Sequence, residues 1–531
     1  MTITAKSSSA PMWSPFRHRP YAIIWTATLV SNIGGWMYSS TSAWLMTSLD
    51  SSPLMVSLVQ VASSLPMFLF AIPSGALADI VDRRRFLIGA ECYITLVSTL
   101  FAITVWLHLI TPGMLLLFTF LVESGSAATS PAWQSVVPDL VPHDDLGPAL
   151  AMNSVGVNIS RALGPALGGV ITASFGIAAP FWVNAVSNLG SIGALVWWRA
   201  PMRRTSQLPA ERFAGAIRTG IRHARFNSHL RATTIRAVGF FLFASCYWAL
   251  LPLVARNQLH GGAPLYGILL GAIGLSAILG AFALPWLKLH LGPNEVVAVG
   301  SLSTAVAMIL FGLAHNSPIA LLACVIAGSS WIAVLANLNV SAQLALPEWV
   351  KGRGLAIYVT VFFGAMTLGS IVWGQVASIG GLPLAHFSAA AGAVLAVAFT
   401  WRWRLQTGSG SDLTPSMSWP TPTVNESIDG DSGPVLVMVE YMINPKDREA
   451  FLDAAESLSH ERGRDGAFAW GVFEDVASPG HMVETFYVES WFEHLRQHER
   501  VTKADRAIEK KIHTLLISAT RTTHLLSSQR R

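Results

Sequence analysis

Apolar stretches of about 20 residues, the length that an α-helix needs to cross a bilayer, recur from Tyr21 to Trp403. Only 12% of the residues are charged and 52% are hydrophobic, whereas a soluble protein carries roughly twice that charged fraction. Lipid is therefore the expected solvent for much of the chain. The stretches predict twelve helical spans, at 21–46, 54–78, 86–109, 114–136, 149–172, 179–198, 235–255, 265–287, 296–314, 318–344, 355–379 and 384–403.

A basic, mostly polar stretch at 199–236 separates six spans from six more, which predicts two related halves. Part of it, Glu211 to Phe226, has helical spacing and fits a helix on an anionic membrane surface or a solvated connector equally well. After Leu405 the residues Gly, Ser, Pro and Thr dominate, as in flexible linkers. We expect a first half at 1–200, a central loop at 201–234, a second half at 235–405, a linker at 406–433 and a soluble domain at 434–531.

Basic residues indicate the orientation of the spans. If the spans alternate, nearly all Arg and Lys residues of the loops fall on one side, which the positive-inside rule makes cytoplasmic. The net charge of +5 then reports orientation and not nucleic-acid binding. The N-terminal residues have no apolar core of the signal-peptide type, so we expect no cleavage. These features predict a multi-pass protein of the plasma (inner) membrane with both termini in the cytoplasm.

The C-terminal region has a different periodicity. Strands are expected at 435–443, 467–474, 482–489 and 517–525, with helices at 444–462 and within 491–515, and Asn444 capping the first helix. The order β-α-β-β-α-β predicts an α+β ferredoxin-like domain. Its histidines have no metalloprotease spacing, so we expect them to be exposed and predict no metal and no cofactor. They are His460, His481, His494, His498 and His524.

A charged cluster follows the second span in the sequence "GALADIVDRR", residues 75–84. A glycine permits close helix approach, and an aspartate one turn before arginines can pair with them at the membrane surface. The cluster is interpreted as a conformational latch between the halves, or as a plain basic anchor. Its residues are Gly75, Asp79, Arg83 and Arg84.

The stretch "NISRALGPALGG", residues 158–169, combines a helix-bending proline with glycines that allow tight packing. An ordinary kinked packing helix is the alternative. The matching positions are Gly164, Pro165, Gly168 and Gly169.

Together the two motifs resemble those of the major facilitator superfamily, and the second resembles the motif of its exporter, or antiporter, branch. Ile80 and Asp82 depart from the first motif, and Ser160 replaces the first glycine of the second. Residues 130–169, together with residues 489–506 of the tail, resemble the enterobactin-exporter-like group, the transmembrane secretion effectors. The tail itself is similar to the dimeric antibiotic-biosynthesis-monooxygenase domain.

Ionisable residues inside the spans are costly and usually functional. Glu123 and Arg161 each lie about 21 Å from the same loop along their helices, so they are expected to pair. The pair is either a fixed interhelical ion pair or a proton-coupling site in which Glu123 takes up the proton. Glu91 is a second candidate, although a surface pair with the nearby arginines of residues 83–85 explains it as well.

The resemblance implies that the first, fourth, seventh and tenth helices line the transport pathway. Amide and aromatic residues on these helices are therefore candidates for a cavity with little fixed charge, suited to a bulky, partly apolar molecule such as a siderophore or a drug. They are Asn32, Tyr247, Trp248, Trp331, Asn337 and Asn339.

The sequence thus predicts a proton-coupled efflux transporter that works by alternating access and is not an enzyme. The chain lacks a phosphate-binding glycine loop, which disfavours ATP-driven transport. A transporter fused to a monooxygenase-like enzyme and a membrane sensor that binds without transport are the alternatives. The expected partners are the lipid bilayer, a small-molecule substrate, protons and, through the C-terminal domain, a second copy of the chain, with no nucleic acid.

Overall fold

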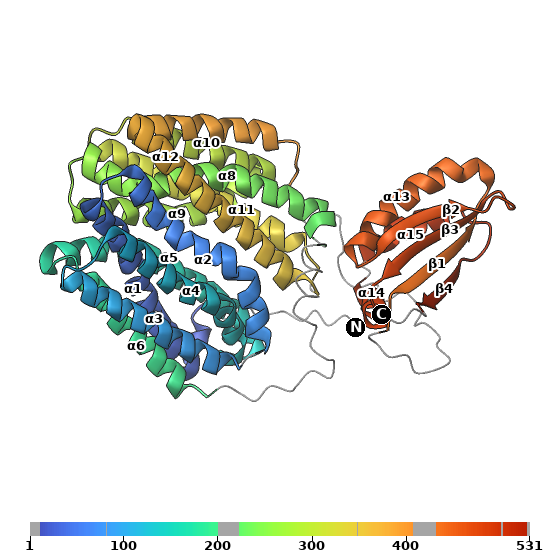
Figure 1. The fold of residues 1–531 in the computed structure, drawn as a ribbon, viewed down its shortest axis with the longest axis horizontal. Coiled ribbons are helices and arrows are strands. Elements are labelled where there is room, and N and C mark those ends of the chain that lie inside the picture. Colours follow the sequence, from blue (N-terminus) through green and yellow to red (C-terminus); the bar gives the residue numbers. More distant parts are fainter. Residues whose placement is uncertain are drawn as a thin grey trace. The chain divides into compact units, whose positions relative to one another are not determined.

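The computed structural model describes residues 11–80, 82–199, 222, 224–347, 349–406, 432–500 and 503–527. The chain folds into two compact units (Figure 1). The first comprises Met1–Pro209, Thr234–Asn339 and Tyr358–Leu405, and the second comprises Ala210–Thr233, Val340–Ile357 and Gln406–Arg531.

The first unit is a bundle of long helices, and each predicted span overlaps one of them. Among the described residues, eight helices are long and apolar enough to cross a membrane. The last two predicted spans share α12, which Gly381 interrupts with a positive φ of 79°. The helices are α1 (Arg19–Leu49), α2 (Pro53–Ile80), α3 (Arg83–Trp106), α4 (Pro112–Leu140), α5 (Leu146–Phe175), α6 (Ala179–Trp197), α8 (Ser228–Leu253), α9 (Ala263–His290), α10 (Pro293–Gly312), α11 (Ser317–Leu344) and α12 (Lys351–Thr400).

Prolines and short polar caps set where these helices begin. Proline occupies the first turn of α1, α4, α6, α9 and α10. The N–H groups of a first turn have no acceptor within the helix, so proline, which lacks an N–H, costs no hydrogen bond there. Thr111 caps α4 by accepting a hydrogen bond from the Met114 amide at 3.3 Å. Asp82 does the same for α3, with the Arg85 amide at 2.8 Å. The helix starts are therefore encoded locally, ahead of any tertiary contact.

Helix α5 packs against both α1 and α9 through small residues (Figure 1). A Cβ placed on Gly164 would lie 2.9 Å from the Ile33 carbonyl oxygen of α1. A Cβ on Gly169 would lie 2.6 Å from the Ala263 carbonyl oxygen of α9. Real Cβ atoms do not come this close, so both positions require glycine for the observed approach. Gly168 of the same motif faces α1 at Met37.

The two halves of the bundle also meet between α2 and α12. The hydroxyls of Ser64 and Thr367 lie 2.8 Å apart, and the Leu54 amide donates to the Ser378 hydroxyl at 3.2 Å. Leu54 lies close to Asp50, at the end of the bundle where α1 turns into α2, called here the Asp50 end. The Leu54–Ser378 contact of α2 with α12 lies at this end, and the Ser64–Thr367 contact lies further into the bundle.

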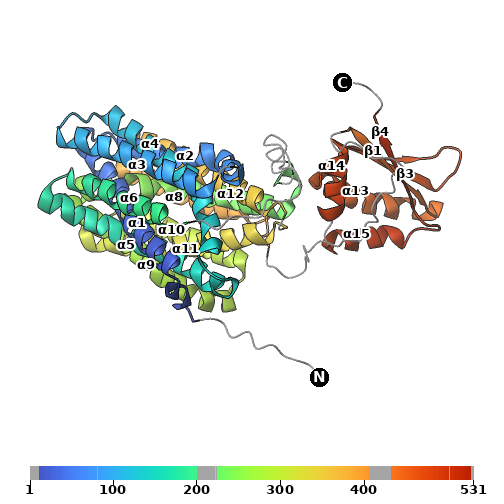
Figure 2. The same ribbon diagram turned by 90° about the horizontal axis from the view of Figure 1, so that it is seen from below.

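The second unit contains a four-stranded sheet in the order β2-β3-β1-β4, in which all neighbours are antiparallel. Its elements are β1 (Val435–Met442), α13 (Arg448–Arg464), β2 (Phe468–Glu474), β3 (His481–Val488), α14 (Trp491–Arg500), α15 (Lys503–His513) and β4 (Arg521–Leu526). Figure 2 shows the helices on one side of the sheet. Alternate side chains of β1 and β3 are buried and join α13 residues such as Phe451 and Leu458 in the core.

Two local predictions for this region are wrong in detail. Asn444 caps a short 3₁₀ turn, Pro445–Asp447, by accepting from the Lys446 amide at 3.1 Å, and α13 begins only at Arg448. The last strand begins at Arg521 and not at Ile517, because the Ile517 amide instead donates to Met442 in a loop contact at 2.8 Å.

Glu484 of β3 is a buried carboxylate, 2% exposed, held by three donors. The Tyr441 hydroxyl donates to it at 2.7 Å, the Trp470 indole at 2.9 Å and the Arg462 Nε at 3.2 Å. Arg462 is itself buried and also lies 3.6 Å from Glu509. The carboxylate therefore ties β1, β2, β3, α13 and α15 into one polar network.

Substituting Glu484 by Gln is expected to destabilise this domain by about 3 kcal/mol, because the buried Arg462 loses its closest counter-charge. Hydrogen exchange of the β1 and β3 amides in the full-length protein measures the loss. The control is Glu474→Gln, which breaks an exposed pair with Arg448 and should change little. Equal protection in the two variants would show that the network does not stabilise the fold.

Substituting Gly267 of α9 by Ala is expected to destabilise the bundle by about 1–3 kcal/mol, since the new Cβ would lie 2.6 Å from the Pro165 carbonyl oxygen. Thermal unfolding in detergent micelles tests this. Gly190→Ala on α6 is the matched control, because nothing lies within 4 Å of its Cβ position. If both variants melt together, α5 and α9 do not depend on this close approach.

Candidate functional site

Arg161 lies on α5 near the middle of the bundle, three residues before the glycine that packs on α1. Its guanidinium carbon stands 5.2 Å from the ring centroid of Trp36 on α1. Among the described residues its buried Nε has no hydrogen-bond partner. Tyr247 of α8 lies within electrostatic range of Arg161. A cation of the first half is therefore near an aromatic side chain of the second half.

Tyr247 belongs to an aromatic cluster of the second half. The Trp331 ring of α11 contacts Phe241 and Trp248 of α8 edge to face, both with centroids 5.3 Å apart. Tyr247 is fully buried and stacks on Phe311 at 6.0 Å. The indole N–H of Trp331 is buried and makes no hydrogen bond within the described part of the chain. The cluster thus combines apolar surface with an unused donor.

The predicted cavity residues do not all belong to this cluster. Tyr247, Trp248 and Trp331 do. Asn337 is buried, but its side-chain amide donates to the Ala333 carbonyl of its own helix at 2.7 Å. This hydrogen bond lies within α11 and does not reach the aromatic cluster. Asn32 and Asn339 are half-buried.

The expected ion pair between Glu123 and Arg161 is not formed, since no charged contact joins them in the described structure and Arg161 faces Trp36 instead. Glu123 is half-buried on α4 and lies within electrostatic range of Tyr38 of α1. Equal depth along two helices fixes height but not the direction in which each side chain points. Here α5 packs on α1 and α9, whereas α4 packs mainly on α2 and α3.

Glu91 of α3 is buried, 7% exposed, and accepts a hydrogen bond from the Trp133 indole of α4 at 3.3 Å. Its hydrogen-bond partner is therefore an indole of the neighbouring helix, in place of the surface arginines considered from the sequence. A carboxylate buried between two helices keeps its place among the candidates for proton uptake.

The charged cluster at 75–84 is only partly described, because the surroundings of Gly75 and of the Asp79 side chain are not among the described features. Arg84 donates from Nε to the Leu195 carbonyl at 2.9 Å and from Nη2 to the Val196 carbonyl at 2.6 Å. It thus caps the C-terminal end of α6, within the first half. Arg83 is half-buried.

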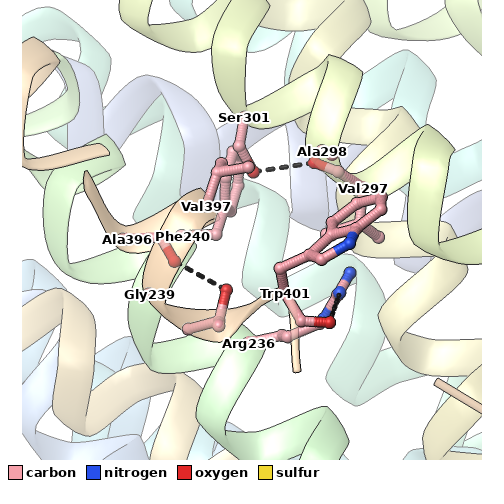
Figure 3. Close-up of a pocket in the computed structure, with 10 residues that line it drawn as sticks. Arg236, Gly239, Phe240, Val297, Ala298, Ser301, Ala396, Val397 and Trp401 are labelled. Atoms are coloured by element: carbon pink, nitrogen blue, oxygen red, sulfur yellow. Dashed lines mark hydrogen bonds between the residues drawn. The ribbon is translucent and has the colours of Figure 1, made fainter. Parts of the chain in front are cut away.

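Two arginines with defined roles were not singled out from the sequence. Arg236 of α8 is 4% exposed and donates to backbone carbonyls of Trp403 at 2.8 Å and Asn294 at 3.3 Å, while Trp401 covers it at 5.6 Å (Figure 3). The pocket around it holds only about 10 Å³, room for one water. Arg236 therefore caps the end of α12, and no substrate fits there.

Arg256 links the two halves at the Asp50 end. It lies in a π-helical turn, Val254–Gln258, and its Nη1 donates to the hydroxyls of Thr47 at 2.9 Å and Ser48 at 2.7 Å. Its guanidinium also lies 5.8 Å from the Trp44 ring, which stacks on Tyr266 of α9. The sequence does indicate that Arg256 is unusual, because it is an arginine on the side of the membrane where the loops otherwise lack arginine and lysine.

A larger pocket of about 690 Å³ lies between α2, α3 and α4, and its lining is mostly apolar. Phe70, Phe86 and Tyr93 contribute aromatic surface, and Arg85 is the charged residue in the lining. The volume is in the range of small-molecule sites. Sequence reasoning missed it because it placed cavity residues only on the first, fourth, seventh and tenth helices.

The histidines of the second unit are not uniformly exposed, contrary to the prediction. His460 is exposed, but His494 is fully buried, and His498 and His524 are half-buried beside it. The spacing of His494 and His498 on α14 does not predict that His524 lies beside them, because His524 is on β4, more than twenty residues further along the chain.

Comparison with known proteins gives consistent results. A family model described as transmembrane secretion effector matches residues 10–531. The staphyloferrin A transporter of Staphylococcus aureus is 23% identical over 66% of this chain and 87% of its own length. The multidrug efflux pump Tap of Mycolicibacterium fortuitum is 23% identical over 68% of this chain and 90% of its own.

The fold is also that of solved transporters. The crystal structure of a bacterial homologue of the human lysosomal transporter Spinster, inward-facing and unoccupied, covers 74% of this chain and 97% of its own, with 16% identity and a TM-score of 0.57. The long apolar helices, the family match and these relatives together identify the chain as a multi-pass membrane transporter of the efflux type. The protein belongs to the transmembrane secretion effector family of the major facilitator superfamily.

Proposed function

We propose that the protein exports a bulky, partly apolar small molecule, of siderophore or drug type, across the plasma membrane in exchange for protons. The observation that carries the proposal is the central cluster, in which Arg161 of one half lies within electrostatic range of Tyr247, and Tyr247 belongs to the aromatic cluster around Trp331 of the other half. A site built from both halves changes shape when the halves rock, as alternating access requires. The names of the two relatives, a siderophore transporter and a multidrug pump, support the same class of cargo.

The proposed topology has twelve spans. Eight helices meet the length and hydropathy requirement. The 31 residues of α1, the 30 of α5 and the 19 of α6 are also long enough, and small polar residues within them pack against neighbouring helices. Gly381 divides α12 into two spans. The C-terminal domain is proposed to be ferredoxin-like, since its β2-β3-β1-β4 sheet has the strand order of that fold and its elements run β1-α13-β2-β3-α14-α15-β4, with two helices where the fold has one.

We further propose that the helical bundle, in the conformation described, is open toward the cytoplasm and closed toward the outside. The positive-inside rule places both termini in the cytoplasm and the Asp50 end outside. The contacts of Arg256 with Thr47 and Ser48, and those of Gly169 with α9, would then close the outer side. The π-helical turn that carries Arg256 is a candidate hinge, because such turns deform more easily than a regular helix.

The central cluster also favours a substrate chemistry. The Arg161 guanidinium has a buried donor without a partner among the described residues, and the Trp36 ring beside it and the aromatic cluster that includes Tyr247 provide apolar surface. A molecule with an anionic or hydrogen-bond-accepting group on an apolar body satisfies both. A sugar phosphate is disfavoured, since several converging arginines would be expected for it. Carboxylate- and hydroxamate-bearing chelators and acidic drugs therefore head the list of substrates to test.

Proton coupling is proposed to run through Glu123, with Glu91 as the second candidate. Glu123 lies on α4 beside Tyr38 of α1, and helices α1 and α4 line the pathway in the proposed family mechanism. The cluster of Asp79 with Arg83 and Arg84 stays a proposed conformational latch, in which Arg84 holds α6 as well. The C-terminal domain is proposed to regulate or dimerise the transporter, and its buried carboxylate, Glu484, has a structural role because three hydrogen-bond donors from neighbouring elements hold it.

The proposal is tested with everted membrane vesicles that hold an imposed proton gradient. Vesicles with the protein should accumulate at least one labelled siderophore or acidic hydrophobic antibiotic in a gradient-dependent manner, and vesicles without it should not. Arg161→Gln should raise the KM for an anionic substrate about tenfold, as expected for the loss of one charge-assisted hydrogen bond of about 1.5 kcal/mol. Gradient-independent uptake, or an unchanged KM, would contradict the proposal.

Glu123→Gln is expected to abolish gradient-driven uptake while leaving equilibrium binding of the substrate unchanged, because an amide cannot carry the proton. Glu91→Gln is the matched comparison, since both variants replace an acid within a helix of the first half. It should retain most activity, because the amide can still accept from the Trp133 indole. Loss of coupling in Glu91→Gln alone would move the proton site to α3.

A further inference from the structure

Three histidines of the C-terminal domain converge in space. His494 and His498 lie one turn apart on α14, and their Nε2 atoms are 3.2 Å apart. The ring of His524, on β4, has its centroid 4.6 Å from that of His494. A ligand nitrogen of each of the three lies within 4.8 Å of the other two. The cluster therefore joins the helix to the edge strand of the sheet.

The local fold explains the convergence. Spacing of i and i+4 puts His494 and His498 on one face of α14. Pairing of β4 with β1, with His524 opposite Val437, fixes His524 in the sheet. Trp491, at the start of α14, packs its ring 5.4 Å from His494 and 6.1 Å from His524. The three rings are thus held by a helix, a strand register and an aromatic neighbour.

The spacing of the nitrogens fits a tetrahedral metal ion. Two nitrogens that each lie 2.0–2.1 Å from a tetrahedral zinc ion are separated by about 3.3 Å. The observed 3.2 Å between the Nε2 atoms of His494 and His498 matches that separation. A third nitrogen within 4.8 Å needs only a small side-chain movement to complete the set.

The chemistry of the rings is also suitable. His494 is fully buried, and a neutral imidazole nitrogen is a common ligand of divalent transition metals. The Nδ1 of His494 is buried and has no hydrogen-bond partner among the described residues. The carboxamide of Gln497 is buried within reach of His494, and its oxygen is likewise unused. Gln497 is therefore placed to accept the Nδ1 proton and orient the ring.

We propose that His494, His498 and His524 form a binding site for a divalent transition-metal ion, with zinc the best fit. Three neutral imidazoles are ligands of zinc, copper and nickel and are poor ligands of magnesium or calcium. A fourth coordination position is left for water or a small molecule. His498 and His524 keep part of their surface exposed, which gives an ion a route to the site. Binding would fasten α14 to β4 and stabilise the domain in proportion to metal concentration.

The test uses the full-length protein, purified in detergent with a tag that contains no histidine and stripped with a chelator. Titration with zinc against a chromophoric chelator should show one ion per chain. His498→Ala and His524→Ala should each weaken binding by more than about 100-fold, because losing even a group that only orients a ligating histidine costs 10- to 100-fold. His460→Ala is the matched control and should bind as the wild type does, because His460 is an exposed histidine on α13 whose Nδ1 contacts the Glu456 carbonyl of its own helix.

Cobalt substitution keeps the test decisive if an alanine variant misfolds. The wild-type protein loaded with cobalt should show the visible bands of a tetrahedral ion. His524→Cys retains a ligand and should add a thiolate-to-cobalt charge-transfer band in the near ultraviolet. Absence of stoichiometric zinc binding, or wild-type affinity in both His498→Ala and His524→Ala, would overturn the proposal and leave the cluster as a hydrogen-bonded imidazole pair beside a third ring.

Discussion

The packing of α5 between α1 and α9 is the contact on which the rest of the transport unit depends. Gly164 admits α1 and Gly169 admits α9, so one helix holds elements of both halves. Arg161 lies one turn before Gly164 and therefore on nearly the same face of α5. The glycine contact with α1 thus sets the direction of the guanidinium and brings it over Trp36. The same packing that closes the interface between the halves positions the central cation.

Arginines at the helix ends show that a basic residue near a membrane surface has more than one physical role. The C-terminal carbonyls of a helix lack partners and carry partial negative charge. Arg84 satisfies those of α6, and Arg236 satisfies those at the end of α12. The last helix of each half is therefore fastened to its own half by an arginine. Counting such residues gives the orientation of the chain, but it does not reveal which of them are also caps.

The sequence predicted most of the helices because the thickness of a bilayer fixes their length and apolar character. It predicted the strands of the C-terminal domain because period-two burial is a local property of β1 and β3. Contacts that depend on the rotation of a helix about its axis were not predictable. The depths of Glu123 and Arg161 follow from counting residues, yet they do not meet, because each faces a different neighbour. His524 joins His494 only through the strand register, which the sequence does not state.

Some buried polar groups of this protein are fully hydrogen-bonded and others have no partner among the described residues. The first kind stabilises the fold, and the second kind can bind a ligand. Glu484 accepts three hydrogen bonds and Asn337 is bonded within its helix, so neither group gains from a ligand. The Nε of Arg161 and the Nδ1 of His494 are buried without a partner among the described residues. An unsatisfied buried polar group lowers stability by roughly 1–3 kcal/mol. A ligand that satisfies such a group recovers this free energy, so Arg161 in one unit and His494 in the other are two positions at which ligand binding is physically favoured.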